Sequence, residues 1–208
     1  MSVVWKVKYK RSSVRQPRSV QPALPGSRHI TPLCNEFADS GGVSGPEKAG
    51  PSPDGETLDG ALATPFFLSQ ALVPAMADAG WGRIVAITSI AVREPQPMLV
   101  LSNTLRAGLT GYLKSLADEV ASNGVTVNSI LPGYTATDRL TELAGIKAEA
   151  MGTTPEALLA NWASMAPIGR LLEPAEVAAA AAFLCSDAAS GITGHALPVD
   201  GGYGRGLL

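Results

Sequence analysis

The 208-residue sequence has few cysteines, few charged side chains and no long apolar run. Its two cysteines, Cys34 and Cys185, stand far apart, so the spacing predicts neither a metal motif nor a disulfide framework. The apolar runs are short and interrupted, which argues against a transmembrane helix, and the first residues lack the apolar core of a secretory signal. We therefore expect a cytoplasmic protein with no metal and no membrane partner.

Acidic residues are missing from the start of the chain. Residues 1–30 contain seven lysines and arginines and no acidic residue, whereas the whole chain carries a net charge of −2. Such a split indicates a basic arm attached to an acidic body, and an organelle transit peptide is an alternative interpretation of the same composition. The overall charge does not point to a nucleic-acid partner, and none is predicted.

A strand, glycine-rich turn and helix that could bind a dinucleotide are also missing from the first part of the chain. In residues 3–10, apolar and aromatic side chains alternate with mostly lysine side chains, as in a half-exposed strand. A central strand of a parallel sheet is instead continuously apolar. The glycines at 41–45 precede a loop rather than a helix. The predicted organisation is a loop-rich arm at 1–40, a Gly/Pro linker at 41–55 and a folded domain at 56–208.

From residue 56 onward, helical and strand patterns alternate. The contiguous apolar residues 84–87 predict a buried strand of a parallel sheet at 82–89. A second buried strand is expected at 125–133, and a final strand and turn at 196–202. Helices are expected at 56–80, 101–124, 138–165 and 173–190. Pro65 and Pro74 should kink the first of these helices, and Asn123–Gly124 should end the second. This order predicts an α/β three-layer sandwich with a parallel sheet.

Three segments of this domain carry the motifs of a known family: GRIVAITSI at 82–90, GVTVNSILPGYTATDRL at 124–140, and PIGRLLEPAEVAAAAAFLCSDAASGITGHALPVDGGY at 167–203. Together they resemble the short-chain dehydrogenase/reductase (SDR) family, in particular its 3-oxoacyl-(acyl carrier protein) reductase-like members. The resemblance implies a Rossmann-like fold, an NAD(P) cofactor and a small carbonyl or acyl substrate. Because the arm at 1–40 has no counterpart in the family, the implied Rossmann-like sandwich is partial, without a recognisable first βαβ half.

The resemblance also assigns the catalytic positions. The family uses a serine at a strand end, a proton-donating tyrosine thirteen residues later, a lysine four residues beyond, and an asparagine on an earlier helix. Ser89 matches the serine, but Ser102, Arg106 and Ala61 occupy the tyrosine, lysine and asparagine positions. An aliphatic hydroxyl is a poorer acid than a phenol, and arginine stays protonated. The sequence therefore predicts a degenerate active site and an impaired catalyst, since losing a general acid costs ~10²–10⁴ in rate.

Simpler interpretations of these residues remain open. Ser89 could cap a loop, Ser102 could cap the helix that follows it, and Arg106 could be a surface or interface arginine. By resemblance, the cofactor would contact the residues after the strand at 125–133, namely Pro132, Gly133, Tyr134, Thr135 and Thr137. Among them, Tyr134 is the best candidate for a replacement acid.

Three hypotheses follow for the whole chain. The first is an NAD(P)-dependent SDR-like oxidoreductase with reduced activity. The second is a non-catalytic SDR-like subunit, since the family builds dimers and tetramers through the helix beginning near Ser102 and through the C-terminal segment. The third is a truncated remnant with no independent function. The low charge and the Ala-rich stretch at 175–185 favour a homo-oligomer, a dimer or a tetramer.

Overall fold

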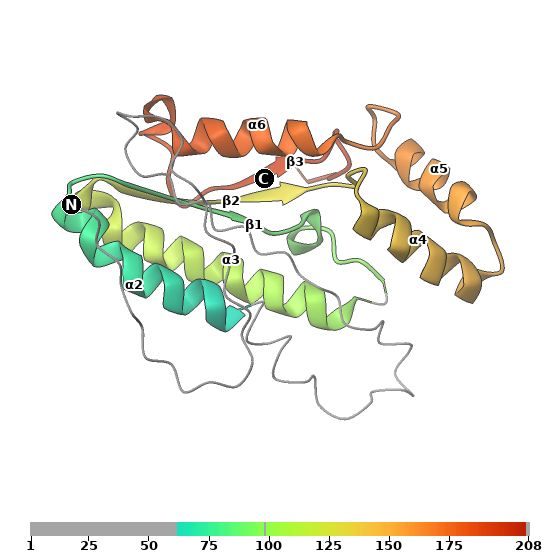
Figure 1. Cartoon of the computed structure of the whole chain (residues 1–208), viewed down its shortest axis with the longest axis horizontal. Coiled ribbons are helices and arrows are strands. Elements are labelled where there is room, and N and C mark those ends of the chain that lie inside the picture. Colours follow the sequence, from blue (N-terminus) through green and yellow to red (C-terminus); the bar gives the residue numbers. More distant parts are fainter. Residues whose placement is uncertain (1–61, 98, 207–208) are drawn as a thin grey trace.

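The computed structural model describes residues 62–97 and 99–206 (Figure 1). The predicted arm at 1–40, the linker at 41–55 and Ala61 lie outside the described residues. Among the described helices, none is both long and apolar enough to cross a membrane.

A parallel three-stranded sheet forms the centre of the fold. Its strands are β1 (Gly82–Ile87), β2 (Val125–Pro132) and β3 (Ala196–Val199), in the order β1-β2-β3. β1 and β2 are buried along almost their whole length, as expected for a parallel sheet covered on both faces. The buried positions of β2 include the polar side chains of Thr126, Asn128 and Ser129. The three predicted strands and their parallel arrangement are therefore confirmed.

Helices cover the two faces of this sheet. α2 (Thr64–Asp78) and α3 (Val100–Val120) pack on one face, and α6 (Pro174–Cys185) lies on the other (Figure 1). Leu109, Leu113 and Ala117 of α3 are buried against β1 and β2. On the opposite face, Leu184 and Cys185 of α6 pack against the sheet. This is the expected three-layer sandwich.

Pro65 and Pro74 of α2, and the glycine that follows α3, lie where the sequence placed a helix start, a helix interior and a helix end. Pro65 lies in the first turn of α2, where a missing N–H leaves no bond unmade, and Pro74 lies inside the helix, which continues to Asp78. After α3, a 3-10 turn (Ala121–Asn123) leads to Gly124 at φ +74°, a left-handed cap. The predicted stop at Asn123–Gly124 is confirmed.

The helical structure expected at 138–165 is confirmed, but it is divided by a break that the expectation did not include. The chain forms two helices there, α4 (Asp138–Met151) and α5 (Pro155–Met165). Gly152 ends α4 at φ +64°, and the Thr154 side chain then caps α5 with Pro155 in its first turn. The pair forms a helical hairpin with a small core of its own, at one end of the sheet (Figure 1). That core consists of Ala144, Ala148, Leu158 and Trp162.

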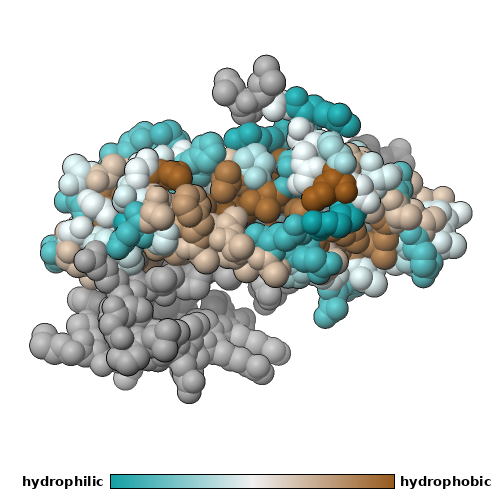
Figure 2. All heavy atoms as spheres, turned by 90° about the horizontal axis from the view of Figure 1, so that it is seen from above, coloured by the Kyte–Doolittle hydropathy of each residue, from teal (hydrophilic) through white to brown (hydrophobic). Residues whose placement is uncertain are grey.

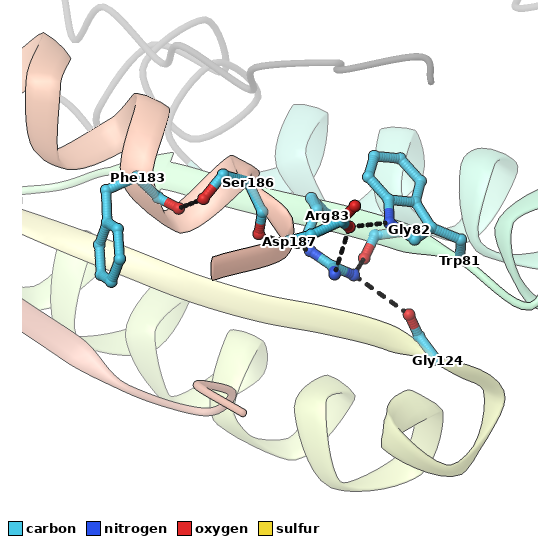
Figure 3. A network of polar contacts seen from close by, with 7 residues as sticks. All are labelled: Trp81, Gly82, Arg83, Gly124, Phe183, Ser186 and Asp187. Carbon is cyan, nitrogen blue, oxygen red and sulfur yellow. Dashed lines mark hydrogen bonds and ion pairs between the residues drawn. The ribbon is translucent and has the colours of Figure 1, made fainter. Parts of the chain in front are cut away.

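The amino-terminal edge of the sheet is tied together by Arg83, which is 4% exposed. Its Nη1 donates to the carbonyl oxygens of Gly82 at 2.8 Å and Gly124 at 3.3 Å, and its Nη2 lies 3.5 Å from a carboxylate oxygen of Asp187 (Figure 3). The same oxygen of Asp187 accepts a 2.9 Å bond from Nε1 of Trp81, whose ring faces the guanidinium at 4.9 Å. This cluster lies at the opposite edge of the sheet from the predicted site.

Candidate functional site

The loops that follow the three strands meet at the carboxyl edge of the sheet. Thr88 and Ser89 follow β1, Gly133 follows β2, and Asp200 follows β3. The Thr88 amide donates to the Ile130 carbonyl at 2.8 Å. In open α/β sheets this edge is where ligands bind. The candidate site is therefore built from the loops that contain the sequence-predicted residues.

Ser102 and Arg106 form a pair on α3 that reaches the end of β1. Nε of Arg106 donates to Oγ of Ser102 at 2.9 Å, and Nη1 donates to the carbonyl oxygen of Thr88 at 2.6 Å. Thr88 directly precedes Ser89 in the chain, so the guanidinium is bonded to the peptide unit that joins these two residues. The structure therefore bonds Ser102 to Arg106 and places this pair at the backbone next to Ser89.

The capping interpretations have different outcomes. α3 begins at Val100 with Leu99 at its N-cap, so Ser102 lies inside the first turn and does not cap the helix. Ser89 does cap the short helix Ile90–Val92, because its Oγ accepts a 3.1 Å bond from the Ala91 amide. The capping interpretation is thus wrong for Ser102 and correct for Ser89.

Both serine hydroxyls are held as acceptors by a fixed N–H group. For Ser102 the donor is Arg106, and for Ser89 it is the backbone of Ala91. A hydroxyl that accepts through its oxygen still has its own hydrogen to donate, and the incoming bond strengthens that donation. The arrangement can supply hydrogen bonds to a substrate oxygen, but the described residues place no tyrosyl–lysyl pair beside Ser89.

Tyr134 stands against an aromatic wall and does not have the character of an acid catalyst. Its ring stacks on Trp162 with centroids 5.1 Å apart and an interplanar angle of 4°, and its hydroxyl donates to Oε1 of Gln96 at 3.0 Å. Burial, together with the neighbouring Tyr203, raises the pKa of Tyr134 to about 12. A raised pKa opposes proton donation, so this geometry does not favour Tyr134 as the replacement acid.

The other residues predicted to contact the cofactor make structural contacts at the end of β2 and in the segment that follows it. Pro132 ends β2, and Gly133 donates from its amide to the Val199 carbonyl at 2.9 Å. A Cβ added to Gly133 would lie 2.7 Å from Cα of Asp200, so only glycine fits there. Thr135 pairs with Leu172 in an isolated bridge, and the Thr137 side chain caps α4 by accepting from the Leu140 amide at 3.2 Å.

Three residues of this edge carried no site prediction: Gln96, Asn103 and Tyr203. Gln96 bonds to both Tyr134 and Tyr203, and Asn103 holds the Gln96 backbone. A polar residue between two prolines, Pro95 and Pro97, was the available signal for Gln96. In the part of the chain that the structure describes, no group of three His, Cys, Asp or Glu side chains could hold a metal.

The site lies inside a region that matches a protein family. Residues 55–204 match the family model described as enoyl-(acyl carrier protein) reductase, a model of the SDR family. The chain belongs to the short-chain dehydrogenase/reductase family. Three similar curated proteins are the putative ketoacyl reductase of the monensin polyketide synthase from Streptomyces virginiae, acetoacetyl-CoA reductase from Rhizobium meliloti, and 3-oxoacyl-(acyl carrier protein) reductase from Haemophilus influenzae.

These SDR relatives are longer than this chain. The first is 32% identical over 188 residues, which are 89% of this chain and 72% of the relative. The second is 38% identical over 156 residues, which are 74% of this chain and 60% of the relative. The third is 39% identical over 141 residues, which are 68% of this chain and 54% of the relative. The 188-residue match to the first relative is longer than the region 56–208, so it extends beyond the predicted start of the folded domain. The boundary at residue 56 therefore stays a prediction.

Solved SDR structures share the fold. A variant of actinorhodin polyketide ketoreductase with NADPH has a TM-score of 0.75 at 26% identity, over 85% of this chain and 68% of its own. L-sorbose reductase from Gluconobacter frateurii, complexed with NADPH and L-sorbose, has a TM-score of 0.72 at 28% identity, over 85% and 67%. The resemblance predicted from the sequence motifs is thus confirmed at the level of family and fold.

Proposed function

We propose that this protein is an NAD(P)-dependent SDR oxidoreductase whose capacity for carbonyl reduction is low. The observation that carries the proposal is the Ser102–Arg106 pair, which lies beside Ser89 where the family resemblance puts a phenol and an amine. Family membership supports a reductase, and the exchanged pair supports impairment. A 3-oxoacyl or other small carbonyl compound is the proposed substrate, in line with the names of the similar proteins.

The described residues fit the nicotinamide end of such a cofactor. The hydroxyl group of Thr135 and the guanidinium of Arg106 are hydrogen-bonding groups suited to ribose hydroxyls and a carboxamide. Thr137 caps the amino terminus of α4, where the helix dipole favours a phosphate. These groups would hold the cofactor together with Gly133 and Tyr134. When bound, the nicotinamide supplies a hydride for the substrate carbon.

The residues of this chain would act on the substrate oxygen. The Ser89 and Ser102 hydroxyls donate hydrogen bonds to it, and Arg106 fixes Ser102 while adding a positive charge nearby. Such donors stabilise a developing oxyanion, an effect that removal of one donor changes by ~10²–10³-fold in well-studied enzymes. The proton that completes a carbonyl reduction has to come from water, because arginine does not release one.

A second candidate function is reduction of a carbon–carbon double bond conjugated to a carbonyl group. Hydride addition to the distal carbon gives an enolate, and the proton then goes to carbon rather than to oxygen. A site with two hydroxyl donors and a fixed cation, but without a phenol beside them, suits this chemistry better than it suits carbonyl reduction. The description of the matching family model points the same way.

Cofactor binding and two substrates test the proposal together. Titration with NADPH and NADH should give saturable nicotinamide fluorescence, and NADPH oxidation should then be followed with acetoacetyl-CoA and with crotonyl-CoA. Slow oxidation with acetoacetyl-CoA supports an impaired carbonyl reductase, and faster oxidation with crotonyl-CoA supports the second candidate. No saturable binding at high protein concentration would overturn both and favour the non-catalytic subunit or the remnant.

We also propose that the protein is a homo-oligomer that buries α6. The outer side of this helix is lined by alanines and by Phe183, which is 45% exposed, and Figure 2 shows apolar side chains gathered on this face of the molecule. A helix that is apolar all round is normally buried on both sides. Light scattering should give a dimer or tetramer mass for the native chain and a smaller mass for Phe183→Glu. A monomeric native chain would overturn this assembly.

A further inference from the structure

Gln96 connects the loops that follow all three strands. It lies in the loop after β1, and its side-chain partners come from the loop after β2 and the loop after β3. Oε1 accepts from the Tyr134 hydroxyl at 3.0 Å, while Nε2 donates to the Tyr203 hydroxyl at 3.2 Å and to the Glu94 carbonyl at 2.8 Å. Its side-chain amide is therefore fully engaged in joining three segments far apart in sequence.

The backbone of Gln96 is fixed as well. Its amide donates to Oδ1 of Asn103 at 3.3 Å, and its carbonyl accepts from Nδ2 of Asn103 at 2.9 Å. Asn103 is the neighbour of Ser102 on α3, and Pro95 and Pro97 restrict the backbone on both sides of Gln96. The position of the Gln96 side chain is thus set relative to the helix that carries Ser102 and Arg106.

The partners of Gln96 form the aromatic wall of the site. Tyr134 stacks on Trp162 of α5, which is 6% exposed, and Tyr203 meets Tyr134 edge to face with centroids 5.6 Å apart and planes at 87°. Through this wall, the helical hairpin of α4 and α5 is attached to the loop after β1. Moving the hairpin away requires either breaking the Gln96 bonds or unstacking Tyr134.

We propose that Gln96 is a positioning residue, which holds the aromatic wall of Tyr134, Trp162 and Tyr203 and the attached hairpin against the loop that carries Ser89. This role rests on the proposed reductase function, because it takes a substrate bound beside Ser89 to contact this wall. A substrate bound there meets the wall in both the ground state and the transition state. Loss of Gln96 therefore weakens substrate binding and leaves the chemical step largely unchanged.

Two substitutions of Gln96 separate positioning from packing. Gln96→Met keeps the length of the side chain and removes its hydrogen bonds, whereas Gln96→Glu keeps an acceptor for the Tyr134 hydroxyl. The matched control is Gln70→Met, on the exposed side of α2. In Gln96→Met, amide hydrogen exchange in α5 and at 133–137 should rise about tenfold while that of β2 stays unchanged, as loss of ~1.4 kcal/mol of local stability implies.

Kinetics give the second measurement. With acetoacetyl-CoA and NADPH, Gln96→Met should raise KM about fivefold with kcat within about twofold. Gln96→Glu, which keeps the acceptor for Tyr134 but loses the donor to the Glu94 carbonyl, should recover part of this loss. Unchanged exchange in α5, or a fall in kcat at constant KM, would overturn the proposal. If the native chain binds no NADPH, the reductase function fails, while the exchange measurement still decides whether Gln96 holds the hairpin.

Discussion

Nε of Arg106 lies 2.9 Å from Oγ of Ser102, one helical turn earlier on α3, so the substituted tyrosine and lysine positions are bonded to each other. The same guanidinium reaches the Thr88 carbonyl at the end of β1 at 2.6 Å. Positions that in the family resemblance carry an acid and a base here form one fixed hydrogen-bonded unit. This relationship sets the first prediction.

Restoring the phenol and the amine should increase carbonyl reduction. The double variant Ser102→Tyr/Arg106→Lys supplies a proton donor and a nearby ammonium, and it should reduce acetoacetyl-CoA roughly 10²-fold faster than the native chain. Initial rates of NADPH oxidation measure the change. Ser102→Phe/Arg106→Lys is the control, because it adds the ring without the hydroxyl. Equal rates for the two double variants would show that the phenol is not used.

Arg83 should matter far more for stability than its carboxylate partner. Arg83→Met removes the hydrogen bonds that the buried guanidinium donates to the carbonyl oxygens of Gly82, Gly124 and Ser186, which should lower the free energy of unfolding by about 2–3 kcal/mol. Asp187→Asn should cost less than about 1 kcal/mol, because the Asp187 side chain is 71% exposed and an amide oxygen can still accept from Trp81. Urea unfolding measures both, and similar losses in the two variants would contradict this ranking.

Two left-handed glycines should differ in their tolerance of a methyl group. Gly152 has φ +64° with open space around it, so Gly152→Ala should cost only the backbone term of about 1–2 kcal/mol. Gly124 has φ +74°, and an added Cβ would collide with the Gly80 carbonyl oxygen. Gly124→Ala should therefore cost at least ~1 kcal/mol more, which thermal and urea unfolding can measure. An equal cost would mean that the turn at Gly80 shifts freely.

Tyr134 should make the protein lose stability in alkali. The pKa of Tyr134 is raised to about 12 in the folded chain, whereas an unfolded tyrosine ionises near pH ~10. Between these values the unfolded chain releases a proton that the folded chain retains, so the free energy of unfolding falls as pH rises. The stability difference between the native chain and Tyr134→Phe should therefore shrink from about pH 9 to about pH 12. A constant difference across this range would contradict a half-buried Tyr134 that stays neutral in the folded chain.

The strands of the sheet were predictable because β1 carries a contiguous apolar run at 84–87, and because Pro132–Gly133 marks the end of β2. Strands were expected at 82–89 and 125–133, and β1 and β2 lie inside these limits. The break between α4 and α5 was missed, although Gly152 and Pro155 mark it. Both helices direct apolar side chains toward one small core. The amphipathic periodicity of the sequence therefore continues across the break and does not indicate it.

The site was predictable only where local spacing carries information. Ser89, Ser102 and Arg106 were placed by counting along the chain, and the structure bonds Ser102 to Arg106 at the backbone next to Ser89. Gln96 could not be found in this way, because its partners Tyr134 and Tyr203 are distant in sequence and meet it only after the three strands pair. Side chains that join separate loops give no periodic signal.

The parallel sheet also has a kinetic consequence. A β-hairpin cannot start this sheet, because Gly82 pairs with Val125 and Ser129 pairs with Ala196. Each pairing closes a long loop, and the entropy cost of closing it precedes the first stabilising contact between the strands. Non-local pairing of this kind makes assembly slow compared with the helices, which form on local contacts. During refolding, α3 should therefore acquire its structure well before β3 docks. Until β2 pairs with it, β1 exposes apolar side chains and an unpaired backbone, which promote aggregation. Refolding should therefore recover more native chain at low protein concentration or with a chaperone.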